Sequence, residues 1–179
     1  WAEFDRPVTA QRYGAVPDPE WLERRYKRKW STYDTVNSSI GQGYMLVNPL
    51  QLAVMTARIA SGRKLLPRLT MMQKQPPAPP LDIDPQHLAF VRDAMAGVVN
   101  SGRGTASIAK LPIEGIQMAG KTGTAQVISL NKDRIYSKCE TLRYKERHHG
   151  LFAGFAPADN PKIAVAAVIE HGCHGAAAA

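Results

Sequence analysis

Hydrophobic residues recur at helical spacing in three stretches, residues 19–26, 49–60 and 85–100. Each stretch follows an Asp or Asn and starts with Pro, a pair that is typical of a helix N-terminus. The first is short, basic and aromatic. The second is apolar on almost every side, which predicts a core helix, whereas the third is amphipathic and extends to about Asn100.

Three later stretches, residues 118–128, 151–156 and 163–169, have the character of strands. They follow one another with short or looping connections, which predicts an antiparallel meander. The stretch 163–169 is continuously apolar, which favours a place in the middle of a covered sheet. The pattern therefore predicts an α+β fold in which an antiparallel sheet is packed with helices.

The remaining segments are expected to be mostly irregular. The basic, polar connection 129–147 is long for a compact domain, which indicates a functional or mobile loop. The shorter connections are predicted as a turn-rich segment at 30–34, a glycine-containing loop at 37–44, a short strand at 65–72, an extended proline-rich connector at 75–80, a plain turn at 101–104 and a short helical piece at 105–110.

Composition adds few restrictions. The 179 residues carry a net charge of +8 and are 44% hydrophobic, so the chain can bury a core. Its basic residues fall into two local runs without a nucleic-acid-binding signature, so we expect a solvated surface and no nucleic acid. No stretch is long and apolar enough to span a bilayer. Cys139 and Cys173 could be free thiols, a bridge or neither, and a metal site at Cys173 with His171 is not expected.

The run from Met118 to Ile128 contains the candidate chemistry, because Lys, Thr and Gly interrupt an otherwise strand-like pattern. Period two places Lys121 on one face and Thr122 on the other, so both reach one pocket only if the strand is twisted or lies at the edge of a cleft. Lys121 supplies a cation and Thr122 a hydroxyl for a peptide carboxylate. Gly120 and Gly123 lack a Cβ, so a peptide backbone could approach closely.

Several stretches together resemble the transpeptidase domain of class B penicillin-binding proteins, and most closely the penicillin-binding protein 2 group that serves elongation of rod-shaped bacteria. In chain order these stretches are Pro17 to Trp21, Ser39-Ile-Gly-Gln-Gly-Tyr44, Asn48-Pro-Leu-Gln-Leu-Ala53, Gly97-Val-Val-Asn100, Gly120-Lys-Thr-Gly-Thr-Ala-Gln126, Phe155-Ala-Pro157 and the strand that ends at Glu170. The resemblance covers nearly the whole chain, and only the C-terminal part of the family's domain.

The resemblance implies a peptidoglycan D,D-transpeptidase that forms an acyl-serine intermediate, binds β-lactams and needs no cofactor or metal. Lys121 would supply positive potential and a hydrogen bond in the catalytic network, and Thr122 would bind the substrate carboxylate. Gly123 would permit close approach, and the backbone N–H of Thr124 would be an oxyanion donor. The implied partners are D-Ala-D-Ala stem peptides, a glycosyltransferase and elongation-complex membrane proteins, at the periplasmic face of the bacterial inner membrane.

The family's nucleophile motif is not convincing in this sequence. Ser61 and Ser107 are each followed three residues later by Lys, but the first ends a core helix and the second lies too close to the motif strand. Ser129 begins a Ser-Leu-Asn that follows the strand it should precede. We therefore expect residues 1–179 to be the C-terminal portion of one transpeptidase domain, inactive alone, with the nucleophile and membrane anchor outside the chain.

Two alternatives remain open. One is a related serine enzyme, a β-lactamase or D,D-carboxypeptidase, although the Gly-Gln-Gly-Tyr element favours the transpeptidases. The other is a non-catalytic module whose basic surface binds an anionic partner.

Overall fold

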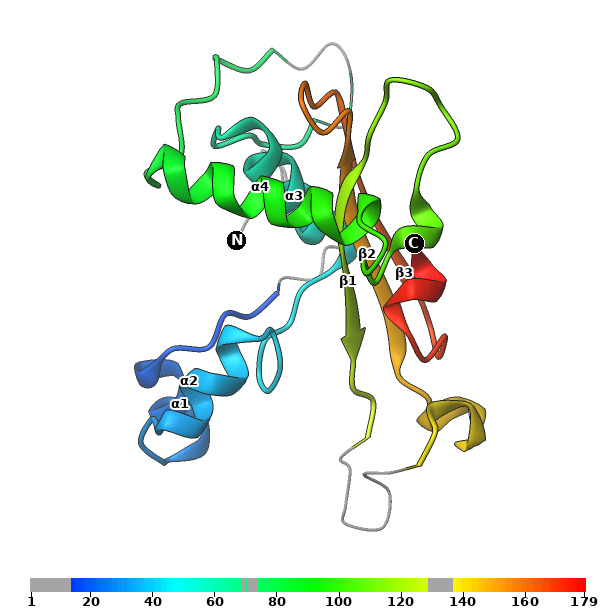
Figure 1. Ribbon diagram of the computed structural model, residues 1–179. Coiled ribbons are helices and arrows are strands. Elements are labelled where there is room, and N and C mark those ends of the chain that lie inside the picture. Colours follow the sequence, from blue (N-terminus) through cyan, green and yellow to red (C-terminus); the bar gives the residue numbers. More distant parts are fainter. Residues whose placement is uncertain (1–13, 69, 71–73, 129–136) are drawn as a thin grey trace.

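A computed structural model describes residues 14–68, 70, 74–128 and 137–179. These residues form an α+β fold with a three-stranded antiparallel sheet, so both the predicted class and the predicted meander are confirmed (Figure 1). The helices are α1 (Pro19–Tyr26), α2 (Thr32–Ser39), α3 (Pro49–Ser61) and α4 (Pro85–Asn100). The strands are β1 (Ala119–Ala125), β2 (His149–Ala156) and β3 (Ile163–Ile169), and short 3-10 turns are η1 (Ser107–Ala109), η2 (Cys139–Thr141), η3 (Tyr144–Glu146) and η4 (Gly175–Ala178).

Three of the helices begin where their caps predict. The side chains of Asp18, Asn48 and Asp84 accept hydrogen bonds from backbone N–H groups two or three residues later, at 2.7, 2.9 and 2.8 Å. These bonds satisfy donors that a helix start leaves free, and the following Pro has no N–H to satisfy. Gly62 ends α3 in the left-handed region, at φ 70°.

The prediction of a turn-rich connection at 30–34 is wrong, because α2 begins inside it. The helix buries no apolar side chain, since Tyr33, Val36 and Ile40 are all exposed, so a buried hydrophobic face does not mark it. A capping box does: the N–H of Ser31 donates to the carboxylate of Asp34 at 2.9 Å. Only the part of the predicted loop 37–44 that follows Ser39 is non-helical.

The strands lie in the order β1-β2-β3, with Ala119 opposite Phe155 and Phe155 opposite Ala164. Within the described residues, β3 is therefore an edge strand, and the prediction that it lies in the middle of the sheet is wrong. Its continuous apolar sequence still leaves one face uncovered, because Ile163, Val165 and Ile169 are 70%, 42% and 43% exposed.

Both faces of the sheet carry a small core. Phe155 packs with Ala60 of α3, Met95 of α4 and Ala119. Phe152 lies three residues earlier on β2 and so points to the opposite face. There it packs with Val99 at the end of α4 and with Ala106, beside Ala178 of η4. Helix α4 and the chain that follows it thus hold β1 on both faces.

A two-bond clasp closes the connection between α3 and α4. The N–H of Lys64 donates to the carbonyl of Pro79, and the N–H of Leu81 donates to that of Gly62, both at 2.8 Å. Residues 65–68 have no regular structure, and the rest of the predicted strand 65–72 lies largely outside the described residues. The turn at 101–104 and a short helical piece, η1, are confirmed.

Cys139 and Cys173 form a disulfide, with their Cα atoms 5.6 Å apart. It joins η2, in the long connection between β1 and β2, to the segment after β3. The N–H of Cys173 also donates to the carbonyl of His148 at 2.9 Å. The 129–147 connection is therefore fastened at its far end, although residues 129–136 lie outside the described part. None of the helices in the described residues is long and apolar enough to cross a bilayer.

Candidate functional site

Strand β1 carries the candidate site and is an edge strand of the sheet. Its inner edge pairs with β2, while no strand of the described residues pairs with its outer edge. The carbonyls of Met118, Thr122 and Thr124 each accept a hydrogen bond from a side chain, at alternate residues. Alternate residues of a strand turn their backbone groups to the same edge. Thr122 and Thr124 thus direct their N–H and C=O groups to the open edge.

Lys121 reaches this open edge from the other face. Its ammonium Nζ donates to the carbonyl of Thr122, and its side chain is otherwise exposed. Strand β1 lies at the edge of the sheet, and the expectation that Lys121 and Thr122 reach one pocket stays a prediction. A cation, a hydroxyl side chain and outward backbone N–H groups thus belong to one edge strand, to which an extended peptide with a carboxylate could add itself as a further strand.

The hydroxyl of Thr122 has a partner that sequence reasoning missed. Its Oγ1 lies 3.0 Å from the Oγ1 of Thr105, which follows the turn at 101–104. Gly104 makes this turn possible, since a Cβ there would lie 2.7 Å from the carbonyl carbon of Val98. No local pattern marks Thr105, because only the fold brings the two threonines together.

The two glycines of the motif differ in their surroundings. A Cβ on Gly120 would lie 2.7 Å from Cε2 of the Phe152 ring and closer still to its Cζ, so this glycine makes room for an aromatic side chain of the chain itself. Gly120 thus has a packing role that the sequence did not predict, and its role toward a peptide backbone stays a prediction. A Cβ on Gly123 would meet only Leu151, at 3.5 Å. The role of Gly123 toward a substrate stays a prediction.

Gln42 is a second residue that sequence reasoning did not place at the site. It lies in the Gly-Gln-Gly loop, and its amide Nε2 donates to the carbonyl of Thr124 at 2.9 Å, across 82 residues of sequence. In the sequence this loop is marked by its glycines and by its resemblance to the family. Its contact with β1 could not be read from the sequence, because nothing local specifies a partner so distant.

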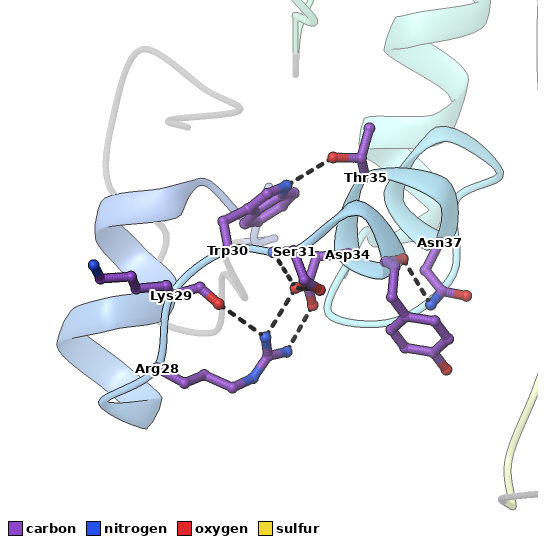
Figure 2. A network of polar contacts seen from close by, with 8 residues as sticks. Arg28, Lys29, Trp30, Ser31, Asp34, Thr35 and Asn37 are labelled. Carbon is purple, nitrogen blue, oxygen red and sulfur yellow. Dashed lines mark hydrogen bonds and ion pairs between the residues drawn. The ribbon is translucent and has the colours of Figure 1, made fainter.

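A polar network supports that loop from α1 and α2 (Figure 2). Arg28 makes two hydrogen bonds to the buried carboxylate of Asp34, at 2.6 and 2.8 Å, and Ser31 adds its hydroxyl at 2.6 Å. The bonds from Arg28 and then Ser31 hold the pKa of Asp34 well below its usual range. The same contact raises the pKa of Arg28. Nearby, the indole N–H of Trp30 donates to Thr35 at 2.8 Å.

The candidate serines do not form a nucleophile motif in the described residues. Ser61 is the last residue of α3, and its Oγ donates to the carbonyl of Ala57 at 2.7 Å. Gly62 turns the chain out of the helix, so Lys64 does not follow one helical turn later. Ser107 is exposed on η1, where its backbone carbonyl accepts a hydrogen bond from the N–H of Lys110 at 3.3 Å. Among the described contacts its hydroxyl has none with the Lys110 ammonium. Ser129 lies outside the described residues.

Comparisons with known proteins agree with this geometry. The family model of the penicillin binding protein transpeptidase domain matches residues 10–179. The peptidoglycan D,D-transpeptidase MrdA of Acinetobacter baumannii is 38% identical over 93% of this chain and 26% of that protein. The protein of the same name from Escherichia coli K12 is 34% identical over 95% of this chain and 28% of that protein. The chain thus spans about a quarter of the length of these curated relatives.

Solved structures of penicillin-binding proteins are also similar to this chain. The Helicobacter pylori penicillin-binding protein PBP2, in complex with MreC, matches with a TM-score of 0.77 at 33% identity, over 89% of this chain and 28% of that one. The Pseudomonas aeruginosa PBP2, in complex with WCK 5153, matches with a TM-score of 0.72 at 36% identity, over 91% and 34%. The edge strand with its Lys-Thr-Gly-Thr sequence, the family model and these relatives together show that the chain belongs to the penicillin-binding protein transpeptidase family.

Proposed function

We propose that the protein containing this chain is a serine-type peptidoglycan D,D-transpeptidase that serves cell elongation. The observation that carries the proposal is the open edge of β1, where Lys121, Thr122 and the N–H of Thr124 face one line. The relatives named peptidoglycan D,D-transpeptidase support the reaction class. The neighbouring PBP2 structures support the elongation role by analogy.

The reaction has two steps. A serine Oγ outside the described site attacks the carbonyl carbon of the penultimate D-Ala, a C–O bond forms, and the C–N bond to the terminal D-Ala breaks. The serine proton passes to the leaving amine. An amine of a neighbouring stem peptide then attacks the acyl ester, a C–N bond forms, the C–O bond breaks, and a proton returns to the serine. The chemistry is acyl transfer and consumes no cofactor.

The residues of β1 serve this reaction by binding and by charge. The substrate carboxylate binds to the hydroxyl of Thr122 beside the Lys121 cation, since a charged acceptor strengthens both bonds. The N–H of Thr124 donates to the carbonyl oxygen as negative charge develops on it. Without a nucleophile at this edge, the chain alone is expected to be inactive.

The proposed partners are D-Ala-D-Ala stem peptides, β-lactams, a glycosyltransferase and membrane proteins of the elongation complex. The H. pylori PBP2 structure is a complex with MreC, which supports a partner of that kind. We place the protein at the periplasmic face of the inner membrane. The Cys139–Cys173 disulfide supports this placement, because disulfides persist in oxidising compartments such as the periplasm.

Labelling of the full-length protein with a fluorescent penicillin tests the proposal. The wild type is expected to form a stable adduct at a serine upstream of this chain. Thr122→Val is expected to weaken initial binding by about 10- to 100-fold, since a hydrogen bond to a charged group contributes roughly 1.5–3 kcal/mol. Thr32→Val, at an exposed threonine of α2, is the matched control and should label as the wild type does.

Each alternative predicts a different outcome. A β-lactamase would release the adduct rapidly, and a D,D-carboxypeptidase would free D-Ala without forming cross-links. A basic binding module would show no labelling and would bind an anionic polymer in a salt-sensitive manner. An adduct on Ser61 or Ser107 would overturn the conclusion that the nucleophile lies elsewhere.

A further inference from the structure

We propose that Gln42 is a positioning residue of the transpeptidase site, which holds Thr124 so that its N–H faces the substrate carbonyl. This inference rests on the proposed function. The carrying contact is the 2.9 Å hydrogen bond from Gln42 Nε2 to the carbonyl oxygen of Thr124. Gln42 itself touches no reacting atom, so its effect is exerted through the strand.

The loop is built to present this side chain. Gly41 and Gly43, on either side of Gln42, have φ values of 73° and 74°, a region that side chains with a Cβ rarely adopt. The N–H of Gln42 donates to the carbonyl of Asn37 at 2.9 Å, which ties the loop back to α2. With its backbone fixed in this way, the half-buried side chain of Gln42 extends to β1.

The far side of the loop is anchored by aromatic rings. Tyr44 lies 5.4 Å from Trp21 and 4.8 Å from Tyr26 between ring centroids, and Arg28 lies 5.9 Å from the centre of its ring. Arg28 is in turn held by Asp34. Figure 1 shows α1 and α2 lying apart from the sheet. The hydrogen bond from Gln42, in the loop after α2, connects this region directly to the site strand.

The bonded carbonyl determines where the Thr124 N–H points. In an extended strand the N–H and C=O of one residue point to the same edge, and here that edge is the open one. The neighbouring residues Gly123 and Ala125 pair with Leu151 and His149 of β2. Gln42 therefore restrains Thr124 on the one side that β2 leaves free. An oxyanion donor contributes most when it is held in place before the charge develops.

The test separates acylation from binding in the full-length protein. The time course of fluorescent-penicillin labelling at several concentrations gives k2, the rate constant of acylation, and K, the dissociation constant of the first complex. In Gln42→Ala we expect k2 to fall roughly 10-fold or more, because small displacements of a catalytic group have effects of this order. K should stay within about twofold, since Thr122 and Lys121 still bind the carboxylate.

Two further variants make the reading specific. Gln42→Glu keeps the size of the side chain but has no N–H to donate, so k2 should fall as it does in Gln42→Ala. Gln86→Ala removes an exposed glutamine side chain at the start of α4 and should match the wild type. The thermal midpoint and the fraction of protein that labels to completion show whether each variant is folded.

Three results would overturn the inference: an unchanged k2 in both Gln42 variants, a loss that appears only as a smaller labelled fraction, or a lower K. The last would mean that Gln42 occupies an acceptor that the substrate itself needs. A wild type that does not label at all would instead refute the proposed function, so the two failures are distinguishable.

Discussion

The ring of Phe152 on β2 fills the space that a side chain at position 120 of β1 would need. The same ring lies close to Gly154, which is paired with Gly120 across the strands. Two glycines in one pair thus leave room for one aromatic ring, which packs with Val99 and Ala106. The first glycine of the Gly-Lys-Thr-Gly sequence serves packing beneath the site.

Gly120→Ala is therefore expected to destabilise the fold. Overpacking of a close-packed contact costs about 1–3 kcal/mol. Gly123→Ala, three residues later on the same strand, is the matched control, because its Cβ would meet Leu151 at an ordinary 3.5 Å. Urea unfolding of both variants checks this, and equal midpoints for the two would contradict the packing argument.

Removal of the disulfide is expected to lower stability substantially. Cys139 and Cys173 are 34 residues apart, and a cross-link of this kind typically contributes about 2–4 kcal/mol by restricting the unfolded chain. The Cys139→Ser, Cys173→Ser double variant should therefore unfold at lower urea concentration. Dithiothreitol should shift the wild type toward the variant and leave the variant unchanged. Alkylation of two thiols in the untreated, denatured wild type would show that the bridge is not formed.

The buried carboxylate of Asp34 should make the α1–α2 region sensitive to acid. Arg28 holds the pKa of Asp34 below its usual value, so its stabilising effect is fully present above the unfolded pKa, about 3.9, and is lost as the pH falls through the lowered folded pKa. Asp34→Asn should lower the thermal midpoint at neutral pH, and the difference from wild type should shrink toward pH 2.

Fluorescence of Trp21 and Trp30, which lie in this region, reports the transition. Glu20→Gln is the control. Glu20 and Arg24 are both exposed and their charged groups come no closer than 3.9 Å, so this ion pair contributes little to stability. If the difference in thermal midpoint between wild type and Asp34→Asn did not change with pH, ionisation of the Asp34 carboxylate would not be its cause.

The open face of β3 should make the isolated 179-residue chain prone to self-association. Exposed apolar residues on an edge strand offer both a surface and unpaired backbone groups to another chain. Val165→Lys is expected to reduce light scattering at equal concentration. Gln86→Lys adds the same charge on α4. If this variant reduced light scattering equally, the cause would be net charge and not the exposed strand.

Local signals in the sequence predicted much of this fold. The Asp84-Pro85 pair located the start of α4, and the apolar run 163–169 matched β3 residue for residue. Both features are encoded within a few neighbouring residues, as caps and strand patterns are. Helix α2 also has a local signal, the Ser31–Asp34 capping box, but it has no buried apolar face, so a search for buried hydrophobic patterns misses it.

The sequence identified the site residues of one strand and not the residues that contact them. Lys121, Thr122 and Thr124 could be named from one strand, but the neighbours of these residues could not. Thr105 and Gln42 come from 17 and 82 residues away. Such contacts depend on the path of the chain, which no local periodicity records. The edge position of β1 and the disulfide were hidden for the same reason.

The clasp that joins Lys64 to Pro79 and Gly62 to Leu81 has a practical consequence. Because it holds Gly62 beside Leu81, added length inside this excursion need not move its two ends apart, and Leu65 near its start is also held by Arg58 of α3, whose Nε donates to the Leu65 carbonyl at 2.9 Å. Lengthening a closed loop adds little entropy cost, about 0.6 kcal/mol for each doubling. An epitope or fluorophore-binding tag inserted between Lys64 and Pro79 would therefore provide a handle for following the protein in cells.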